Sequence, residues 1–183
     1  MLTRDEAVLL LNEEKTDPGL MRHALASEAV LRELALRLGQ PDEVADLWAM
    51  TGLLHDVDYP RTKDNPAMHG LTAAEIIADR LPAEAIYAIQ AHNGEYTNIP
   101  PKSQFDYALR CGETVTGLIA AAALVRPNGM DGMEAKSLKK KMKDKAFAAS
   151  VNRDTIKECE HLGLDLTEFL TLAIKAMSEM PQN

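Results

Sequence analysis

Residues 104–125 read QFDYALRCGETVTGLIAAAALV, a stretch that is rich in alanine and almost entirely apolar. A helix that is apolar on most of its sides must be buried, because no face of it is suited to water. The stretch is therefore predicted to be the central helix of a bundle. No part of the chain shows the sustained alternation of β-branched and polar residues that is typical of strands, so we expect no sheet.

Capping signals and helical periodicity predict further helices on both sides of this segment. Thr3–Glu6 forms a capping box, Asp17 precedes a proline at a second helix start, and Gly39 ends that helix. The fold class is therefore all-α, and we expect one helical domain over residues 1–183. Loops are predicted at 57–66 and 96–103, and the remaining helices at about 42–56, 67–80, 82–94, 134–146, 152–162 and 165–179.

Composition excludes several classes of protein. The chain has 183 residues, 46% of them apolar and 26% charged, which is typical of a globular domain. Its net charge of −8 argues against binding to long nucleic acid. The N-terminal residues include acids and no long apolar block, no apolar run is long enough to span a bilayer, and there are only two cysteines. We therefore expect a cytoplasmic protein without membrane contact.

Histidines mark the candidate functional site. There are five in the chain, and His23, His55, His69 and His92 lie on or at the ends of four successive predicted helices. His55 is followed directly by Asp56. Taken singly, each histidine also suits a polar helix rim or a helix C-terminus. Together they predict a metal site, since bundles hold metals between facing helices. Imidazole and carboxylate ligands favour a divalent transition metal: Fe, Mn, Zn, Ni or Co, with Mg as a further option.

Residues 53–58, Leu-Leu-His-Asp-Val-Asp, resemble the signature of the HD-domain metal-dependent phosphohydrolases. That pattern comprises an upstream His, the His-Asp pair, further histidines and a downstream acid. The chain matches it in order with His23, His55–Asp56, His69, His92 and Glu113. The resemblance covers about residues 20–125. Residues 126–183 look like a C-terminal helical extension found in a bacterial branch of uncharacterised hydrolases.

The resemblance implies roles for these residues. His23, His55, Asp56 and Glu113 would hold one divalent ion. His69 and His92 would either bind a second ion, with Asp56 bridging the two, or act on the substrate by orienting phosphate oxygens or protonating the leaving group.

Three nearby residues have two interpretations each. Arg61 and Lys63, in the loop after the pair, are candidate phosphate contacts or ordinary loop charges. Asp58 either orients a metal ligand or forms a turn.

The chain departs from the pattern at three positions. Glu113 stands where the acid is usually Asp, and its alternative role is to neutralise Arg110 or a lysine. Asn93 follows His92 where the cyclic-dinucleotide phosphodiesterases have a second His, and Tyr59 stands where they have Lys. A cyclic-dinucleotide substrate is therefore not favoured.

The implied function is hydrolysis of a phosphate ester or anhydride by metal-activated water, on a nucleotide or another small phosphorylated metabolite. Two alternatives remain open. One is a di-iron oxygenase of the same superfamily, and the other is a non-catalytic metal-binding sensor or interaction module.

Overall fold

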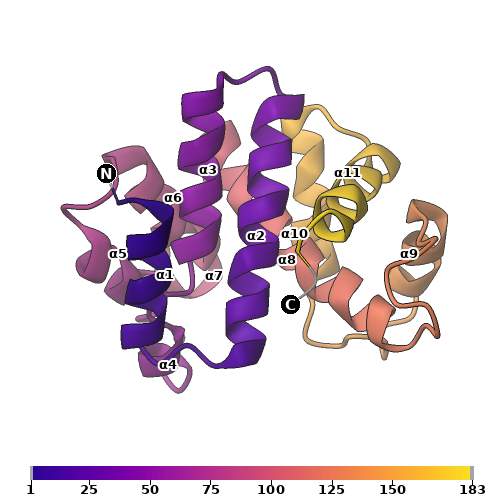
Figure 1. The fold of residues 1–183 in the computed structure, drawn as a ribbon, viewed down its shortest axis with the longest axis horizontal. Helices are drawn as coiled ribbons and strands as arrows, with labels where there is room; N and C mark the ends of the chain where they lie inside the picture. Colours follow the sequence, from indigo (N-terminus) through magenta and orange to yellow (C-terminus); the bar gives the residue numbers. More distant parts are fainter. Residues whose placement is uncertain (1, 182–183) are drawn as a thin grey trace.

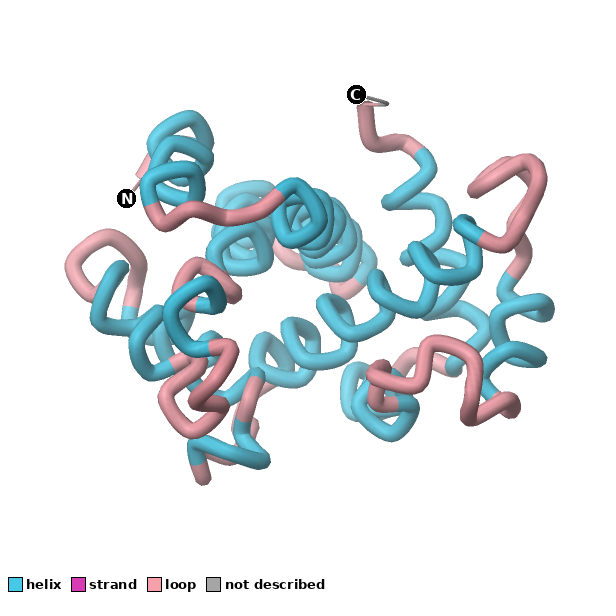
Figure 2. Tube along the Cα trace, turned by 90° about the horizontal axis from the view of Figure 1, so that it is seen from below, coloured by secondary structure: helices cyan, strands magenta, loops and turns pink. Residues whose placement is uncertain are grey.

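The computed structural model describes residues 2–181, and every regular element in that part of the chain is helical (Figures 1 and 2). The all-α prediction is confirmed. The elements, in chain order, are α1 (Arg4–Glu13), α2 (Pro18–Arg37), α3 (Asp42–Leu54), α4 (Tyr59–Thr62), α5 (Leu71–Ile77), α6 (Ala83–His92), α7 (Gly94–Thr97), α8 (Gln104–Leu124), α9 (Ala135–Met142), α10 (Arg153–Lys157), the 3-10 helix η1 (Glu158–Leu162) and α11 (Leu166–Ser178).

Helices α2 and α3 form an antiparallel hairpin at the middle of the view in Figure 1. Gly52 of α3 allows the two backbones to approach closely. A Cβ atom at that position would lie only 2.7 Å from the carbonyl oxygen of Ser27 in α2. The close contact matters for the site, because α2 carries His23 and α3 ends immediately before His55.

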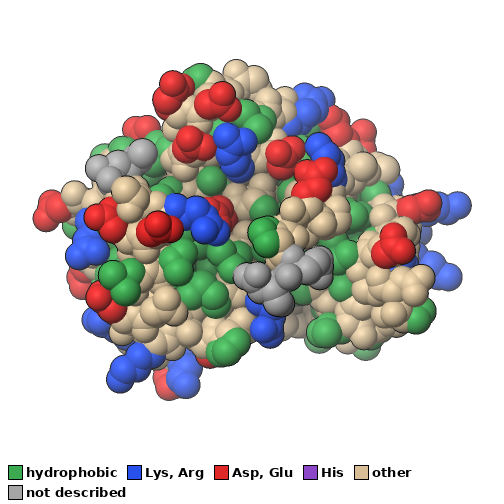
Figure 3. Space-filling model, viewed as in Figure 1, with side chains coloured by type: hydrophobic (Ala, Val, Ile, Leu, Met, Phe, Trp, Pro, Cys, Tyr) green, Lys and Arg blue, Asp and Glu red, His purple; other side chains and the backbone are tan. Residues whose placement is uncertain are grey.

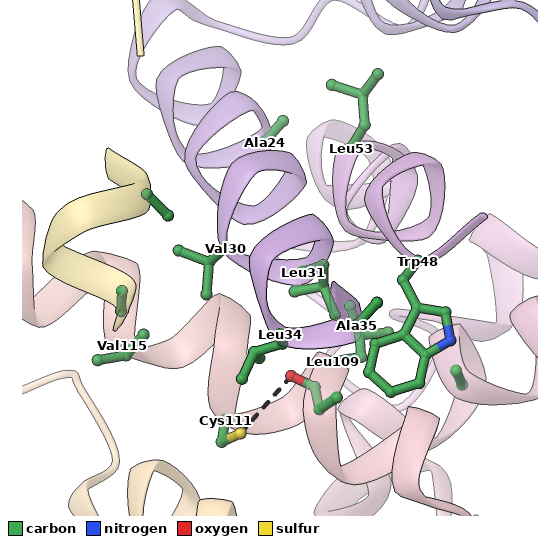
Figure 4. Packing of buried hydrophobic residues seen from close by; sticks show 14 of the residues in the cluster. Ala24, Val30, Leu31, Leu34, Ala35, Trp48, Leu53, Leu109, Cys111 and Val115 are labelled. Carbon is green, nitrogen blue, oxygen red and sulfur yellow. Dashed lines mark hydrogen bonds between the residues drawn. The ribbon is translucent and has the colours of Figure 1, made fainter. Parts of the chain in front are cut away.

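Helix α8 crosses the bundle and is its central helix, as predicted. It packs against α2, α3, α6, α9, α10, η1 and α11. Figure 4 shows Val30 and Leu34 of α2 pointing toward the face of α8 that carries Leu109 and Val115. All four side chains are fully buried. Burial of aliphatic side chains of this size stabilises the fold by about 1.5–3 kcal/mol each, which fixes α8 relative to α2.

Local structure differs from prediction around residues 57–71. The predicted loop contains the short helix α4, and α5 begins at Leu71 rather than near residue 67. The carboxylate of Asp58 accepts hydrogen bonds from the backbone N–H groups of Gly70 (2.9 Å) and Ala73 (3.0 Å). Gly70 also has a φ of +87°, outside the helical region. A cap supplied from 12 residues upstream therefore sets the start of α5.

Helices α9–α11 cover α8 and one side of α2 (orange to yellow in Figure 1), with Phe169 and Leu170 of α11 fully buried. The face of the molecule in Figure 3 carries intermixed acidic and basic side chains. The surface ion pairs include Arg4–Glu28 and Arg32–Asp46. Among the described residues, no helix has both the length and the apolarity needed to cross a membrane.

Candidate metal centre

The fold brings the matched histidines and acids to one place, although they lie up to 90 positions apart. They come from different elements: His23 from α2, His55 and Asp56 from the turn after α3, His69 from the turn before α5, His92 from the last position of α6, and Glu113 from α8. His55, Asp56 and His92 are buried, at 0%, 9% and 9% exposure.

His23 and His55 form the first of two histidine pairs. Their Nε2 atoms are 3.2 Å apart. The same Nε2 of His23 lies 3.6 Å from Asp56 Oδ2 and 3.7 Å from Glu113 Oε2. His23, His55 and Glu113 each offer a ligand atom within 4.8 Å of the others, a spacing that could hold a metal ion.

His69 and His92 form the second pair, with their Nε2 atoms 3.0 Å apart. Oδ1 of Asp56 lies 3.1 Å from Nε2 of His69, 3.4 Å from that of His55 and 3.6 Å from that of His92. Asp56 therefore stands between the two pairs. His55, Asp56 and His92 make up a second group with metal-compatible spacing.

The outer ring nitrogens of two histidines face backbone carbonyls. Nδ1 of His55 donates to the carbonyl oxygen of Gly52 (2.8 Å), and Nδ1 of His92 donates to that of Ile89 (2.5 Å). A carbonyl can only accept, so in each ring the proton is on Nδ1. In the neutral form of such a ring, Nε2 presents a lone pair to the cluster.

For His23 and His69, the partners of Nδ1 are side chains. Thr116 donates its hydroxyl proton to the carbonyl oxygen of Glu113 (2.7 Å), so its oxygen accepts from Nδ1 of His23 (2.8 Å). Nδ1 of His69 donates to Oδ1 of Asp58 (2.9 Å), and Asp58 is itself fully buried. Such outer partners fix ring orientation and tautomer in metal sites.

All four Nε2 atoms thus point inward, in two pairs about 3 Å apart. Two lone pairs facing each other at that distance repel unless a proton or a metal cation lies between them. The ion pairs of Asp56 and Glu113 within the described chain are all with histidine. The donor set, imidazole nitrogens with carboxylates, is the one that transition metals prefer. The residues therefore fit a divalent transition metal.

The electrostatics agree with this fit. Burial lowers the pKa of His55 to about 3, despite the neighbouring charge of Asp56. Burial disfavours ionised Asp56, but His55, His69 and His92 outweigh it and hold the Asp56 pKa well below its usual range. Burial also opposes the charge of His69, yet hydrogen bonds with Asp56 and Asp58 raise its pKa to about 10. Without a metal, His69 therefore keeps a cationic charge inside the cluster.

Burial raises the pKa of Glu113, whereas it lowers the pKa of His55. Loss of solvent raises the pKa of its carboxyl to about 8, although the hydroxyl of Thr114 donates to it. A carboxyl in that state becomes a good ligand only when a cation favours its ionised form. Among the described residues, no ion pair joins Glu113 to Arg110, the partner of its alternative role. The guanidinium of Arg110 bonds to Glu95 (2.6 Å) and Glu158 (2.6 Å) instead.

Arg61 and Lys63 are not brought into the cluster. Arg61 bonds through its guanidinium to Glu14 at the end of α1 (2.5 Å). Lys63 is exposed at the end of α4. His161, the fifth histidine, is also exposed, and its ring stacks on Tyr107.

Sequence reasoning missed Thr116 and the segment 150–152. Thr116 lies three positions after Glu113, so helical spacing alone places both on one face of α8. Residues 150–152 border His23 and Glu113 across a cavity. They come from the connection between α9 and α10, and no local pattern marks them as part of a site.

The architecture and the cluster define an all-helical protein with a histidine–aspartate centre that could hold a metal ion. A family model described as HD domain matches residues 20–145. The chain therefore belongs to the HD-domain family. Comparisons with curated proteins and with solved structures gave no significant match.

Proposed function

We propose that the protein is a metal-dependent phosphohydrolase that acts on a phosphate ester or anhydride of a small metabolite. The inward direction of all four Nε2 atoms carries the proposal, because the four Nδ1 partners enforce it. Membership of the HD-domain family supports hydrolysis as the chemistry.

In this proposal His23, His55, Asp56 and Glu113 hold one divalent ion, and His69 and His92 hold a second with Asp56 between them. The place of Asp56, within 3.6 Å of all four Nε2 atoms, favours two ions over one. When bound, the metal would lower the pKa of a water molecule and polarise a phosphoryl oxygen.

The chain's own groups hold the site in shape. Gly52, Ile89, Thr116 and Asp58 fix the rings, so that little reorganisation accompanies binding. If only one ion binds, His69 and His92 face the substrate instead. The proton that Asp56 and Asp58 stabilise on His69 is then placed to protonate a leaving group.

Metal analysis of protein purified without chelator, followed by phosphate-release assays with Mn(II), Fe(II) and Co(II), tests the proposal. We expect about two ions per chain and metal-dependent phosphate release. His55→Ala should abolish bound metal while helical content stays near wild type. His161→Ala is the matched control, since that ring is exposed and outside the cluster.

Other outcomes would replace the proposal. Oxygen consumption by iron-loaded protein without phosphate release would establish the oxygenase alternative. Tight metal binding without turnover on any phosphate ester or anhydride would establish the sensor alternative.

A further inference from the structure

A cavity of about 290 Å³ opens beside the metal centre. Its lining includes His23 and Glu113 of the metal centre, Thr114 and Gly117 of α8, which we call the floor, and residues 150–152, which we call the wall. That wall lies beyond residue 145, where the family match ends. It therefore belongs to the part of this chain that the family pattern does not describe.

Gly117 lets Val151 of the wall pack closely on α8. A Cβ atom built at this position would lie 3.3 Å from Cγ2 of Val151, closer than ordinary van der Waals contact. Glycine within a helix costs about 1 kcal/mol relative to alanine. The close approach of the wall to α8 is thus kept at some expense in helix stability.

The wall is held in place by several fixed contacts. The guanidinium of Arg153 donates to the carbonyl oxygens of Phe147, Ala148 and Val151. Ala148 has a φ of +44°, a conformation that residues other than glycine rarely adopt. Asn152 caps α10, accepting through Oδ1 from the backbone N–H of Asp154 (2.9 Å). A wall ordered in this way is suited to selective binding.

The chemistry of the lining is neutral and hydrogen-bonding. Beyond His23 and Glu113, the cavity is bordered by two hydroxyls (Thr114, Ser150), the amide of Asn152, and Gly117 and Val151. None of these described lining residues is aromatic, Lys or Arg. Because Oδ1 of Asn152 accepts from the backbone of α10, its Nδ2 is oriented as the remaining donor.

We propose that this cavity binds the non-phosphate part of the substrate, and that this part is a small neutral polyol, so that the substrate is a sugar phosphate. The inference rests on the proposed function, which places the phosphate at the metal centre. Sugar hydroxyls both donate and accept, which matches hydroxyl and amide groups. Apart from His23, which the proposed function assigns to the metal, the lining offers a nucleobase no aromatic stacking partner. The volume is at the small end of ligand sites, about 300–1,000 Å³.

Calorimetric titration of Mn(II)-loaded protein with phosphonates tests the inference directly. The probes are the phosphonate analogues of a pentose phosphate, a hexose phosphate and a nucleoside monophosphate. Methylphosphonate is the reference probe, because it has neither a sugar nor a nucleoside part. We expect at least one sugar phosphonate to bind about tenfold or more tightly than methylphosphonate and than the nucleotide analogue, from one or two added hydrogen bonds.

Two variants probe the cavity. Asn152→Ser keeps an oxygen that can cap α10 but removes the Nδ2 donor without adding a charge, and Gly117→Ala adds a Cβ against Val151 of the wall. Each should weaken the sugar phosphonate about tenfold, leave methylphosphonate within about twofold and leave Mn(II) affinity unchanged. Asn12→Ser, the same change at an exposed position of α1, is the matched control.

The outcomes separate the two proposals. Equal binding of sugar phosphonates and methylphosphonate, preference for the nucleotide analogue, or an unaltered sugar phosphonate affinity in both variants would overturn the sugar subsite, while the metal centre would stand. Failure of the wild-type protein to bind Mn(II), Fe(II) or Co(II) would overturn the proposed function and the inference with it.

Discussion

Replacing Asp58 with asparagine should switch the tautomer of His69 without unfolding the protein. Oδ2 of Asp58 accepts from the backbone N–H groups of Gly70 (2.9 Å) and Ala73 (3.0 Å), and Oδ1 accepts from Nδ1 of His69 (2.9 Å). Asparagine has one oxygen and one NH₂ group. The asparagine can therefore present its oxygen either to the backbone N–H groups of Gly70 and Ala73 or to Nδ1 of His69, but not to both.

The cost of unpaired hydrogen-bond donors decides which of these partners the asparagine oxygen faces. Turning NH₂ toward Gly70 and Ala73 leaves two buried backbone donors unpaired, at about 1–3 kcal/mol each. Turning NH₂ toward His69 instead makes Nδ1 an acceptor and moves the ring proton to Nε2. We expect this second orientation. His69 then has no lone pair for a metal, and changes of this kind weaken metal affinity about 10- to 100-fold, or about 1.4–2.7 kcal/mol.

Titration calorimetry with Mn(II) and urea unfolding of the metal-free protein measure the two halves of this prediction. Asp58→Asn should lose metal affinity but little stability. Asp58→Ala should lose both, with about 2–6 kcal/mol from the two unpaired donors. Asp64→Asn is the control, because Asp64 is exposed and follows the same short helix. Wild-type affinity in Asp58→Asn, or equal destabilisation by the two substitutions, would refute the reasoning.

Three further predictions follow from the site and the packing. His92→Ala should reduce the bound metal from about two ions per chain to about one, measured by plasma emission, and a wild-type stoichiometry of one would assign the ring to the substrate. Glu113→Ala should weaken metal binding and Glu113→Asp should retain it with altered turnover, so equal affinity and turnover in wild type and Glu113→Ala would exclude Glu113 as a ligand. Gly52→Ala should destabilise the metal-free protein by about 1–3 kcal/mol in urea, because its Cβ would lie 2.7 Å from the carbonyl oxygen of Ser27, and unchanged stability would mean that α2 and α3 separate freely.

Local sequence was sufficient for most of the helices. The capping box at Thr3 and the cap at Asp17 are both present, with each side chain accepting from the first turn. The predicted central helix, about residues 104–125, is observed as Gln104–Leu124. These features could be predicted because caps act within three residues and an apolar helix carries its need for burial in its own composition.

The start of α5 could not be predicted in the same way. Its capping carboxylate belongs to Asp58, and its entry requires Gly70 at a φ of +87° beside the carbonyl oxygen of Ile89. The capping carboxylate and the Ile89 carbonyl both lie outside residues 67–71. The helical periodicity predicted a start near residue 67, because it indicates only which residues face the core and not where the helix begins.

The sequence by itself determined which residues meet at the centre, since the order of His23, His55, Asp56, His69, His92 and Glu113 along successive helices is a one-dimensional pattern. The rings of His55 and His92 are oriented locally, by carbonyls three residues earlier. Tertiary structure alone decided the Nδ1 partners of His23 and His69. These bonds and the Arg61–Glu14 pair join segments as many as 93 positions apart, as in the bond between His23 and Thr116. The physical reason is that hydrogen bonds select a tautomer by direction and distance, and these are set only when the helices have packed.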